Sequence, residues 1–110
     1  MNYQRIPINP ALPAQEMEVP LGGNVYRLTL RWNTRDVSWS LDIATRERVP
    51  LIDGLKLVLN HELLDRFADE RLPDGYLIAF DSTGKKTTIE RFDLGNTVQL
   101  VFVPRSEYTP

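Results

Sequence analysis

Residues 25–33 read Val-Tyr-Arg-Leu-Thr-Leu-Arg-Trp-Asn, and residues 37–43 read Val-Ser-Trp-Ser-Leu-Asp-Ile. Apolar side chains occupy the even positions of the first stretch and the odd positions of the second. Alternation with a period of two residues is typical of a β-strand with one buried and one solvated face. If the strands pair as a hairpin, opposed residue numbers must add up to an odd total, because an even total sends the apolar sets to opposite faces. The pattern predicts a hairpin with Trp32 and Trp39 on the same side, closed by a loop of two or four residues.

The rest of the chain repeats this rhythm of short apolar segments between turn residues. After the alternating residues 15–21, Gly22, Gly23 and Asn24 tolerate positive φ and predict a second hairpin turn. Asp53 and Gly54 form another strong turn pair. Further strands are expected on both sides of that pair and later in the chain, at residues 49–52, 55–59, 76–81, 87–92 and 97–103.

Residues His61–Arg71 are the one segment with helical spacing. Leu63, Leu64 and Phe67 fall on one stripe, and Asn60 can cap the start. With the strands, this segment predicts a mainly β fold, a small antiparallel barrel or sandwich of six to eight strands with one short helix.

Size and composition favour one folded domain over residues 1–110, since 42% of the residues are hydrophobic and 25% are charged. Pro7, Pro10 and Pro13 exclude a central strand, so residues 1–13 are expected to form an edge strand or an extended arm. The net charge of −2 gives no field that would gather nucleic acid or an anionic membrane. We therefore expect neither as a partner.

The chain offers little catalytic equipment, with one histidine and no cysteine. His61 and Glu62 open like the zinc-binding H-E-x-x-H helix, but Asp65 stands where the second histidine belongs. We expect no catalytic residue, no cofactor and no metal. A small hydrolase using His61 with a nearby carboxylate is kept as a third hypothesis.

Two features point to binding. Trp32 and Trp39 could form an exposed stacking platform for sugars, although their register with neighbouring leucines favours burial. Arg27 and Arg31 lie two residues apart on the polar face of one strand, and arginine is over-represented in protein interfaces. The two arginines are therefore candidate interface residues.

The hairpin also carries a family resemblance, because Arg31-Trp32-Asn33 is followed by Trp39-Ser40-Leu41-Asp42-Ile43. The order of these and other motifs along the chain resembles the baseplate plug proteins of contractile-tailed bacteriophages and related tail-like particles. The resemblance covers the chain from about Tyr3 to Val103. The other matching motifs are Ile6-Pro7, Pro13, Leu21-Gly22-Gly23, Tyr26-Arg27-Leu28-Thr29-Leu30, Pro50-Leu51, Gly54, Leu57-Val58, Leu72-Pro73, Asp93-Leu94-Gly95 and Leu100-Val101.

This resemblance implies a β-rich structural subunit of the virion, made in the host cytoplasm and built into the tail baseplate. It implies several copies around the tail axis, packed against hub, spike or tube-end proteins, with no catalysis. The arm, Asn2–Pro13, is expected to add an extended segment to the sheet edge of a neighbour. The candidate subunit-interface residues are Tyr3, Arg5, Ile6, Ile8, Arg27 and Arg31. The alternative function is a small ligand-binding β module, for example one that binds carbohydrate through the tryptophans.

Overall fold

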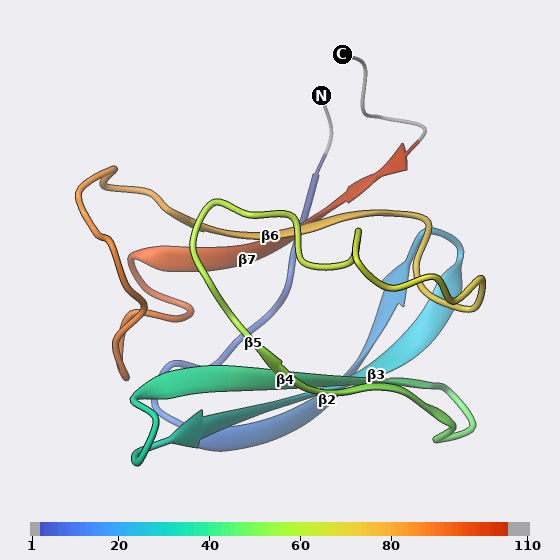
Figure 1. Cartoon of the computed structure of the whole chain (residues 1–110), viewed down its shortest axis with the longest axis horizontal. Coiled ribbons are helices and arrows are strands. Elements are labelled where there is room, and N and C mark those ends of the chain that lie inside the picture. The colour runs from blue at the N-terminus through green and yellow to red at the C-terminus, as the bar shows by residue number, and fades with distance from the viewer. Residues whose placement is uncertain (1–2, 106–110) are drawn as a thin grey trace.

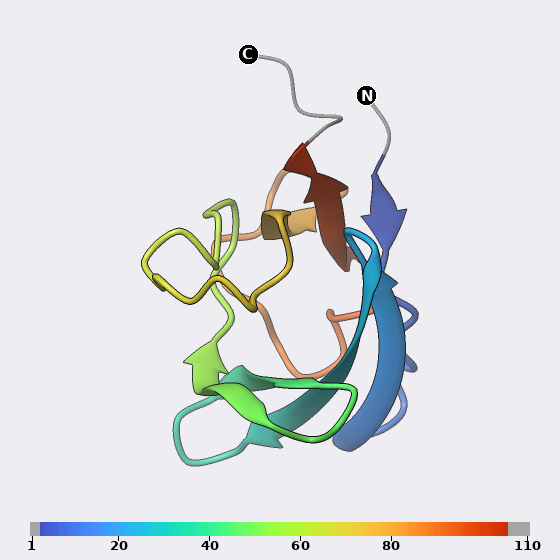
Figure 2. The same ribbon diagram turned by 90° about the vertical axis from the view of Figure 1, so that its right-hand side faces the viewer.

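Two antiparallel sheets make up the fold, in a computed structural model that describes residues 3–105 (Figures 1 and 2). The smaller sheet has the strand order β1-β7-β6, with bounds Gln4–Arg5, Val98–Pro104 and Gly75–Asp81. The larger sheet has the order β2-β3-β4-β5, with bounds Ala14–Leu21, Asn24–Asn33, Ser38–Thr45 and Pro50–Lys56. No strand belongs to both sheets within the described residues, so the sandwich arrangement is confirmed and no closed barrel forms.

The β3–β4 hairpin has the predicted parity. Trp32 lies opposite Trp39, and the register continues to Asn33 opposite Ser38. The closing loop is therefore the four-residue alternative, residues 34–37. This register places the apolar stripes of both strands on one face of the larger sheet.

The β2–β3 hairpin is confirmed as well. Leu21 pairs with Asn24 across a two-residue turn, in which Gly22 has φ 62° and Gly23 has φ 99°. Positive φ at both central positions matches the twist of the flanking strands and is open to glycine without steric cost.

The core lies between the facing sides of the two sheets. Leu28, Leu30 and Leu41 of the larger sheet are 0% exposed. Leu77, Leu100 and Phe102 of the smaller sheet are also 0% exposed, and all six belong to one cluster of buried residues. Full burial of a side chain of this size contributes roughly 1.5–3 kcal/mol, so contact between the sheets is the main source of stability.

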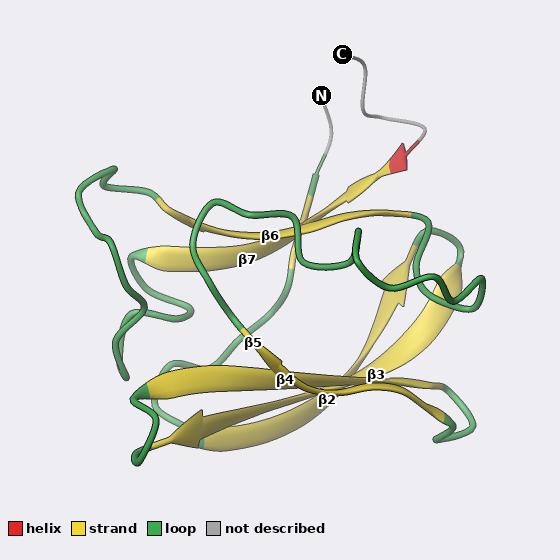
Figure 3. Ribbon diagram, viewed as in Figure 1, coloured by secondary structure: helices red, strands yellow, loops and turns green. Residues whose placement is uncertain are grey.

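The predicted helix at His61–Arg71 is wrong. The connection between β5 and β6 is a loop in Figure 3, with turns and bends at these residues. Its backbone bonds to the edge of β6, because Leu63 N donates to Leu77 O at 2.9 Å and Asn60 N donates to Ala79 O at 2.8 Å. These bonds replace the i→i−4 ladder that a helix requires. Within residues 3–105 no helix is long and apolar enough to cross a membrane.

The two strands predicted around Asp53-Gly54 are one strand, β5, with a bulge instead of a turn. The register of β4 against β5 shifts on both sides of Ile43, and Gly54 has φ 70°. Gly54 N donates to the Asp42 carboxylate at 2.7 Å, which gives the bulged N–H a partner. The turn residues were therefore identified correctly, but their role was not.

The strand predicted at residues 87–92 is also wrong. Asp93 N donates to Glu90 O at 3.1 Å, and Glu90 N donates to the Asp93 carboxylate at 2.8 Å. This reciprocal pair closes a turn over the end of the core, where Ile89 is buried. Local side-chain bonds of this kind compete with a strand ladder.

The N-terminal segment, of which residues 1–2 lie outside the described residues, docks on its own chain as an edge strand. Gln4 and Arg5 pair with Phe102 and Val101 of β7. Ile6 N donates to Leu100 O at 2.9 Å, and the Ile6 side chain is 1% exposed. Removal of this segment would therefore take a buried side chain, Ile6, out of the core.

Gly75, at the start of β6, provides a test of the contact between β6 and β7. A Cβ at this position would overlap Val103 O and lie 2.6 Å from Phe102 Cζ. We expect Gly75→Ala to lower the free energy of unfolding by about 1–3 kcal/mol, because overpacking forces the neighbours apart. Urea denaturation checks this, and an unchanged midpoint would contradict the packing described.

Candidate interaction surfaces

The outer face of the larger sheet holds Arg27 in a network of ion pairs. Its guanidinium lies 3.0 Å from the Glu16 carboxylate and 2.7 Å from the Glu18 carboxylate, both on β2. Arg27 Nε also donates to Arg46 O at 3.3 Å. Since only 22% of the Arg27 side chain is exposed, most of this residue is used to join β2, β3 and the β4–β5 turn.

Arg31, two residues further along β3, is more accessible. Its side chain is 60% exposed, and Arg31 Nη1 lies 2.6 Å from Asp42 Oδ2 on β4. The other Asp42 oxygen accepts the bulged Gly54 N–H, so one carboxylate connects three strands. Sequence alone gave no signal for this role, because a mid-strand aspartate on a polar face is normally solvated.

The N-terminal candidates differ in how accessible they are. Tyr3 is 56% exposed and Arg5 is exposed, whereas Ile8 is half-buried and packs against the core. Ile6 is buried, so its side chain contacts the chain itself. Tyr3 and Arg5 belong to the β1 side of the smaller sheet.

The candidate residues therefore form two separate groups. Arg27 and Arg31 lie on the outer face of the larger sheet, whereas the N-terminal candidates lie along the smaller one. The structure does not bring the six into one surface.

Arg91 is a structural residue that sequence reasoning missed. Its guanidinium donates to Pro10 O at 3.0 Å and to Ala11 O at 3.2 Å. It also lies 5.4 Å from the Trp39 ring centroid and 4.5 Å from the Phe92 ring centroid, within cation–π range. Arg91 thus ties the N-terminal segment to the loop over the core. A single arginine in a predicted strand gives no sequence signal for such a contact.

The tryptophans form one edge-to-face pair, with ring centroids 5.6 Å apart and an interplanar angle of 61°. Trp39 is 1% exposed, as expected, and Trp39 Nε1 donates to Glu90 O at 3.4 Å. Trp32 is only partly buried, and its pair with Trp39 is next to the last pair of the hairpin. The covered Trp39 ring has no free face to stack on a sugar.

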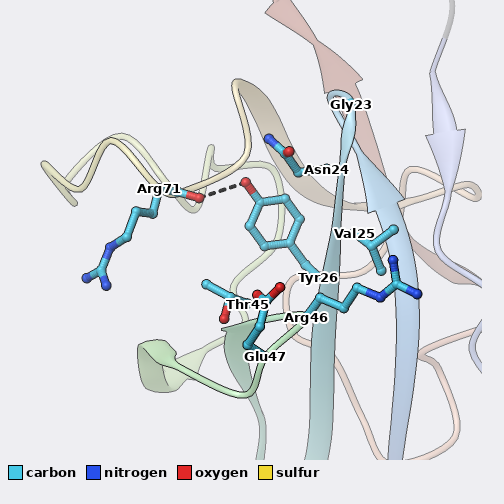
Figure 4. A pocket seen from close by; sticks show the side chains of 8 residues that line it. All are labelled: Gly23, Asn24, Val25, Tyr26, Thr45, Arg46, Glu47 and Arg71. Carbon is cyan, nitrogen blue, oxygen red and sulfur yellow. Dashed lines mark hydrogen bonds between the residues drawn. The ribbon is translucent and has the colours of Figure 1, made fainter.

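A hollow of about 460 Å³ lies between the start of β3 and the β4–β5 turn (Figure 4). The Tyr26 ring stands within it, and the Tyr26 hydroxyl donates to Arg71 O at 2.7 Å. Burial raises the pKa of Tyr26, so this hydroxyl keeps its proton and its bond at neutral pH. The Tyr26 ring therefore connects β3 with the β5–β6 loop, and in Figure 4 the Glu47 carboxylate lies near the ring whereas the Arg46 side chain points away from it.

The catalytic candidates are dispersed. His61 is exposed on the β5–β6 loop, where no local helix forms. The Ser38 hydroxyl donates to the Asp36 carboxylate at 2.7 Å, and the Ser82 hydroxyl donates to Thr97 O at 3.0 Å. Within residues 3–105 no three His, Cys, Asp or Glu side chains gather in a group that could hold a metal ion.

Two carboxylates, Asp69 on the β5–β6 loop and Asp81 at the end of β6, are held in their charged form by nearby donors. The Arg71 guanidinium and backbone N–H lower the pKa of Asp69 to about 2. The Thr83 hydroxyl, followed by the Lys86 backbone N–H, also lowers the pKa of Asp81. Asp81 accepts backbone N–H groups from three residues of the turn after β6, namely Thr83, Lys85 and Lys86.

These features define a class of protein, a two-sheet β structure whose charged side chains mostly support its own strands and loops. The comparison with protein families then identifies it more closely. A family model described as cyanophage baseplate Pam3 plug gp18 matches residues 3–105, and the chain belongs to this family. No curated protein matches the chain. Membership confirms the resemblance and implies a place in a phage tail baseplate, in contact with other baseplate components.

The state of the two indoles can be measured separately. In Trp32→Phe, the remaining Trp39 should emit toward the blue and resist iodide quenching, because its ring is 1% exposed. In Trp39→Phe, the partly buried Trp32 should be quenched more readily. Strong quenching of Trp39, or a change in its emission on adding sugars, would contradict the covered pair.

The lowered carboxylate pKa values predict loss of stability in acid. A depressed folded-state pKa stabilises the fold above the unfolded value of 3.8, and this contribution disappears as the pH falls through about 2 for Asp69. Urea midpoints measured between pH 5 and pH 2 should fall less steeply for Asp69→Asn than for the native chain. The control is Asp65→Asn, at an exposed residue of the same loop. Identical slopes for Asp69→Asn and the native chain would contradict the assignment.

Proposed function

We propose that this chain is a structural subunit of a phage tail baseplate, which joins the axial hub region at the end of the tail tube by protein–protein docking. The match to a baseplate plug family over residues 3–105 carries the proposal. The partners are hub, spike or tube-end proteins, in several copies around the tail axis, and neither nucleic acid nor a membrane takes part. The subunit is made in the host cytoplasm and performs no catalysis.

The way the chain uses its polar groups supports this role. Asp42 and Glu62 accept backbone N–H groups at a bulge and at a strand edge, and Arg91 binds the carbonyls of the N-terminal segment. These groups make a rigid body instead of converging on a reactive centre. A rigid body is suited to docking, because little conformational entropy is lost when it binds.

Most sheet edges are protected against strand addition. The Glu62 carboxylate and the β5–β6 loop cover β6, since Leu77 N donates to Glu62 Oε2 at 2.9 Å. The edge strand β2 contains Pro20, and β5 contains a bulge at Gly54. Proline and bulges are common means of blocking edge pairing. The remaining edge is β1, which lies at one side of the smaller sheet (Figure 2).

We therefore assign the docking surface to β1, with the side chains of Arg5 in the strand and of Tyr3 just before it. Tyrosine and arginine are enriched among the residues that dominate binding energy at interfaces. The accessible Arg31 is a second, independent candidate on the larger sheet. Ile6 supports this surface from below by anchoring β1 in the core.

The test is incorporation of variant chains into phage particles. Particles are produced with the native chain, with the double variant Tyr3→Ala/Arg5→Ala, or with Lys85→Ala, an exposed basic control on a different loop. Copies per particle are counted by quantitative mass spectrometry. We expect native and Lys85→Ala chains at equal copy number, and the double variant roughly tenfold lower, at unchanged thermal stability.

Two results would contradict the proposal at different levels. Absence of the native chain from purified particles would overturn the baseplate role itself. Incorporation of the double variant at the native level would leave that role intact but overturn the assignment of the β1 surface.

A further inference from the structure

Val37, the last residue of the β3–β4 loop, has a strained backbone. Its φ is 51°, in the left-handed region. Asn33 Oδ1 accepts the N–H groups of Arg35 and Asp36, both at 3.0 Å, and this turn leads the chain into that conformation. Glycine and asparagine adopt it readily, whereas a β-branched side chain there is a steric outlier.

Within residues 3–105, burial of the Val37 side chain does not offset this backbone strain. The Val37 side chain is 66% exposed, so it gains little from burial in return. Strained backbone persists where another requirement keeps it, most often at a site of function. The requirement at this position concerns the side chain, because the turn itself would form more easily with glycine.

A second exposed valine lies beside Val37. Val58 follows β5 and is 41% exposed, and the two valines border a hollow of about 230 Å³ with Ile89. Lys56 is the only charged residue among the described lining residues, and its Nζ lies 3.6 Å from Asp36 Oδ2. Its other lining residues are apolar or carry only a hydroxyl group, as Ser38, Thr87 and Thr88 do, so the hollow is mostly apolar and holds one charge.

The size and chemistry of the hollow select its occupant. At about 230 Å³ it is smaller than the ~300–1,000 Å³ of ordinary small-molecule sites, and it is of a size to receive a side chain. Depletion of charge is typical of the centre of a protein interface. A contact of this kind contributes affinity when other contacts already hold the partners together.

We propose that Val37 and Val58 form an apolar docking site that receives an uncharged, apolar side chain of a neighbouring baseplate protein. This inference rests on the proposed function, and it adds a site away from β1. Val37 then serves binding at the expense of stability.

The chain contains a matched control, a second residue with positive φ and an exposed side chain that lies outside the proposed docking site. Arg48, after β4, also has positive φ, at 71°, and an exposed side chain. Val37 precedes β4 and Arg48 follows it, so the two loops lie at opposite ends of this strand (Figure 1). Glycine at either position relieves the steric strain of a left-handed backbone conformation. Only Val37→Gly also removes a proposed docking side chain.

The experiment compares Val37→Gly, Arg48→Gly and Val58→Ser, measuring the melting temperature of each isolated chain and its copy number in phage particles. We expect Val37→Gly to melt on the order of 4 °C above the native chain and to be incorporated about tenfold less. Arg48→Gly should melt at or above the native temperature and be incorporated normally. Val58→Ser should lose incorporation at nearly native stability.

Three outcomes would overturn the inference. One is native-level incorporation of both Val37→Gly and Val58→Ser while the native chain is present in the particles. Another is an equal loss of incorporation with Arg48→Gly. The third is self-association of the native chain in sedimentation that Val37→Gly abolishes, because the occupant would then be a second copy. Failure of the native chain to enter particles is a separate result, since it contradicts the proposed function.

Discussion

The register of the β3–β4 hairpin is the constraint on which the rest of the structure depends. Trp32 opposite Trp39 places the apolar stripes of both strands on one face, and a slip of one residue would send one stripe into solvent. The smaller sheet packs against this face, with Leu77, Leu100 and Phe102 fully buried in the same core. Every other element is held relative to these two surfaces, including the N-terminal segment and the loop that carries Arg91.

The polar residues then divide into those that support the fold and those left for partners. Glu62, Asp42 and Arg91 bind backbone groups that the sheets leave unpaired, so their charges are largely used within the chain. Exposed side chains such as Tyr3 and Val37 make no comparable contribution to the core. In a member of a baseplate plug family, this division is consistent with a rigid part that acts through its surface.

The strands of the sheets were predictable from sequence and the structures of the loops were not, because strand signals are local and loop contacts are long-range. Strand periodicity and the Gly22-Gly23 turn are local signals, so both hairpins follow from sequence, and the β3–β4 hairpin has the predicted parity. The helix failed because Leu63 and Leu64 are buried by contact with β6, a long-range contact that happens to reproduce helical spacing. For the candidate site, the sequence indicated that Arg27 and Arg31 lie on a polar face, but it did not indicate their partners. Arg27 is mostly occupied by two glutamates, and that pairing depends on a register no single segment encodes.

The central claim is that this fold is a docking part of the baseplate, and a reconstruction of the intact particle by electron cryomicroscopy tests it most directly. The account predicts density for the two-sheet fold at the distal end of the tail tube, repeated around its axis, with β1 facing a neighbouring protein. Particles whose complete baseplate density contains no such fold would contradict it.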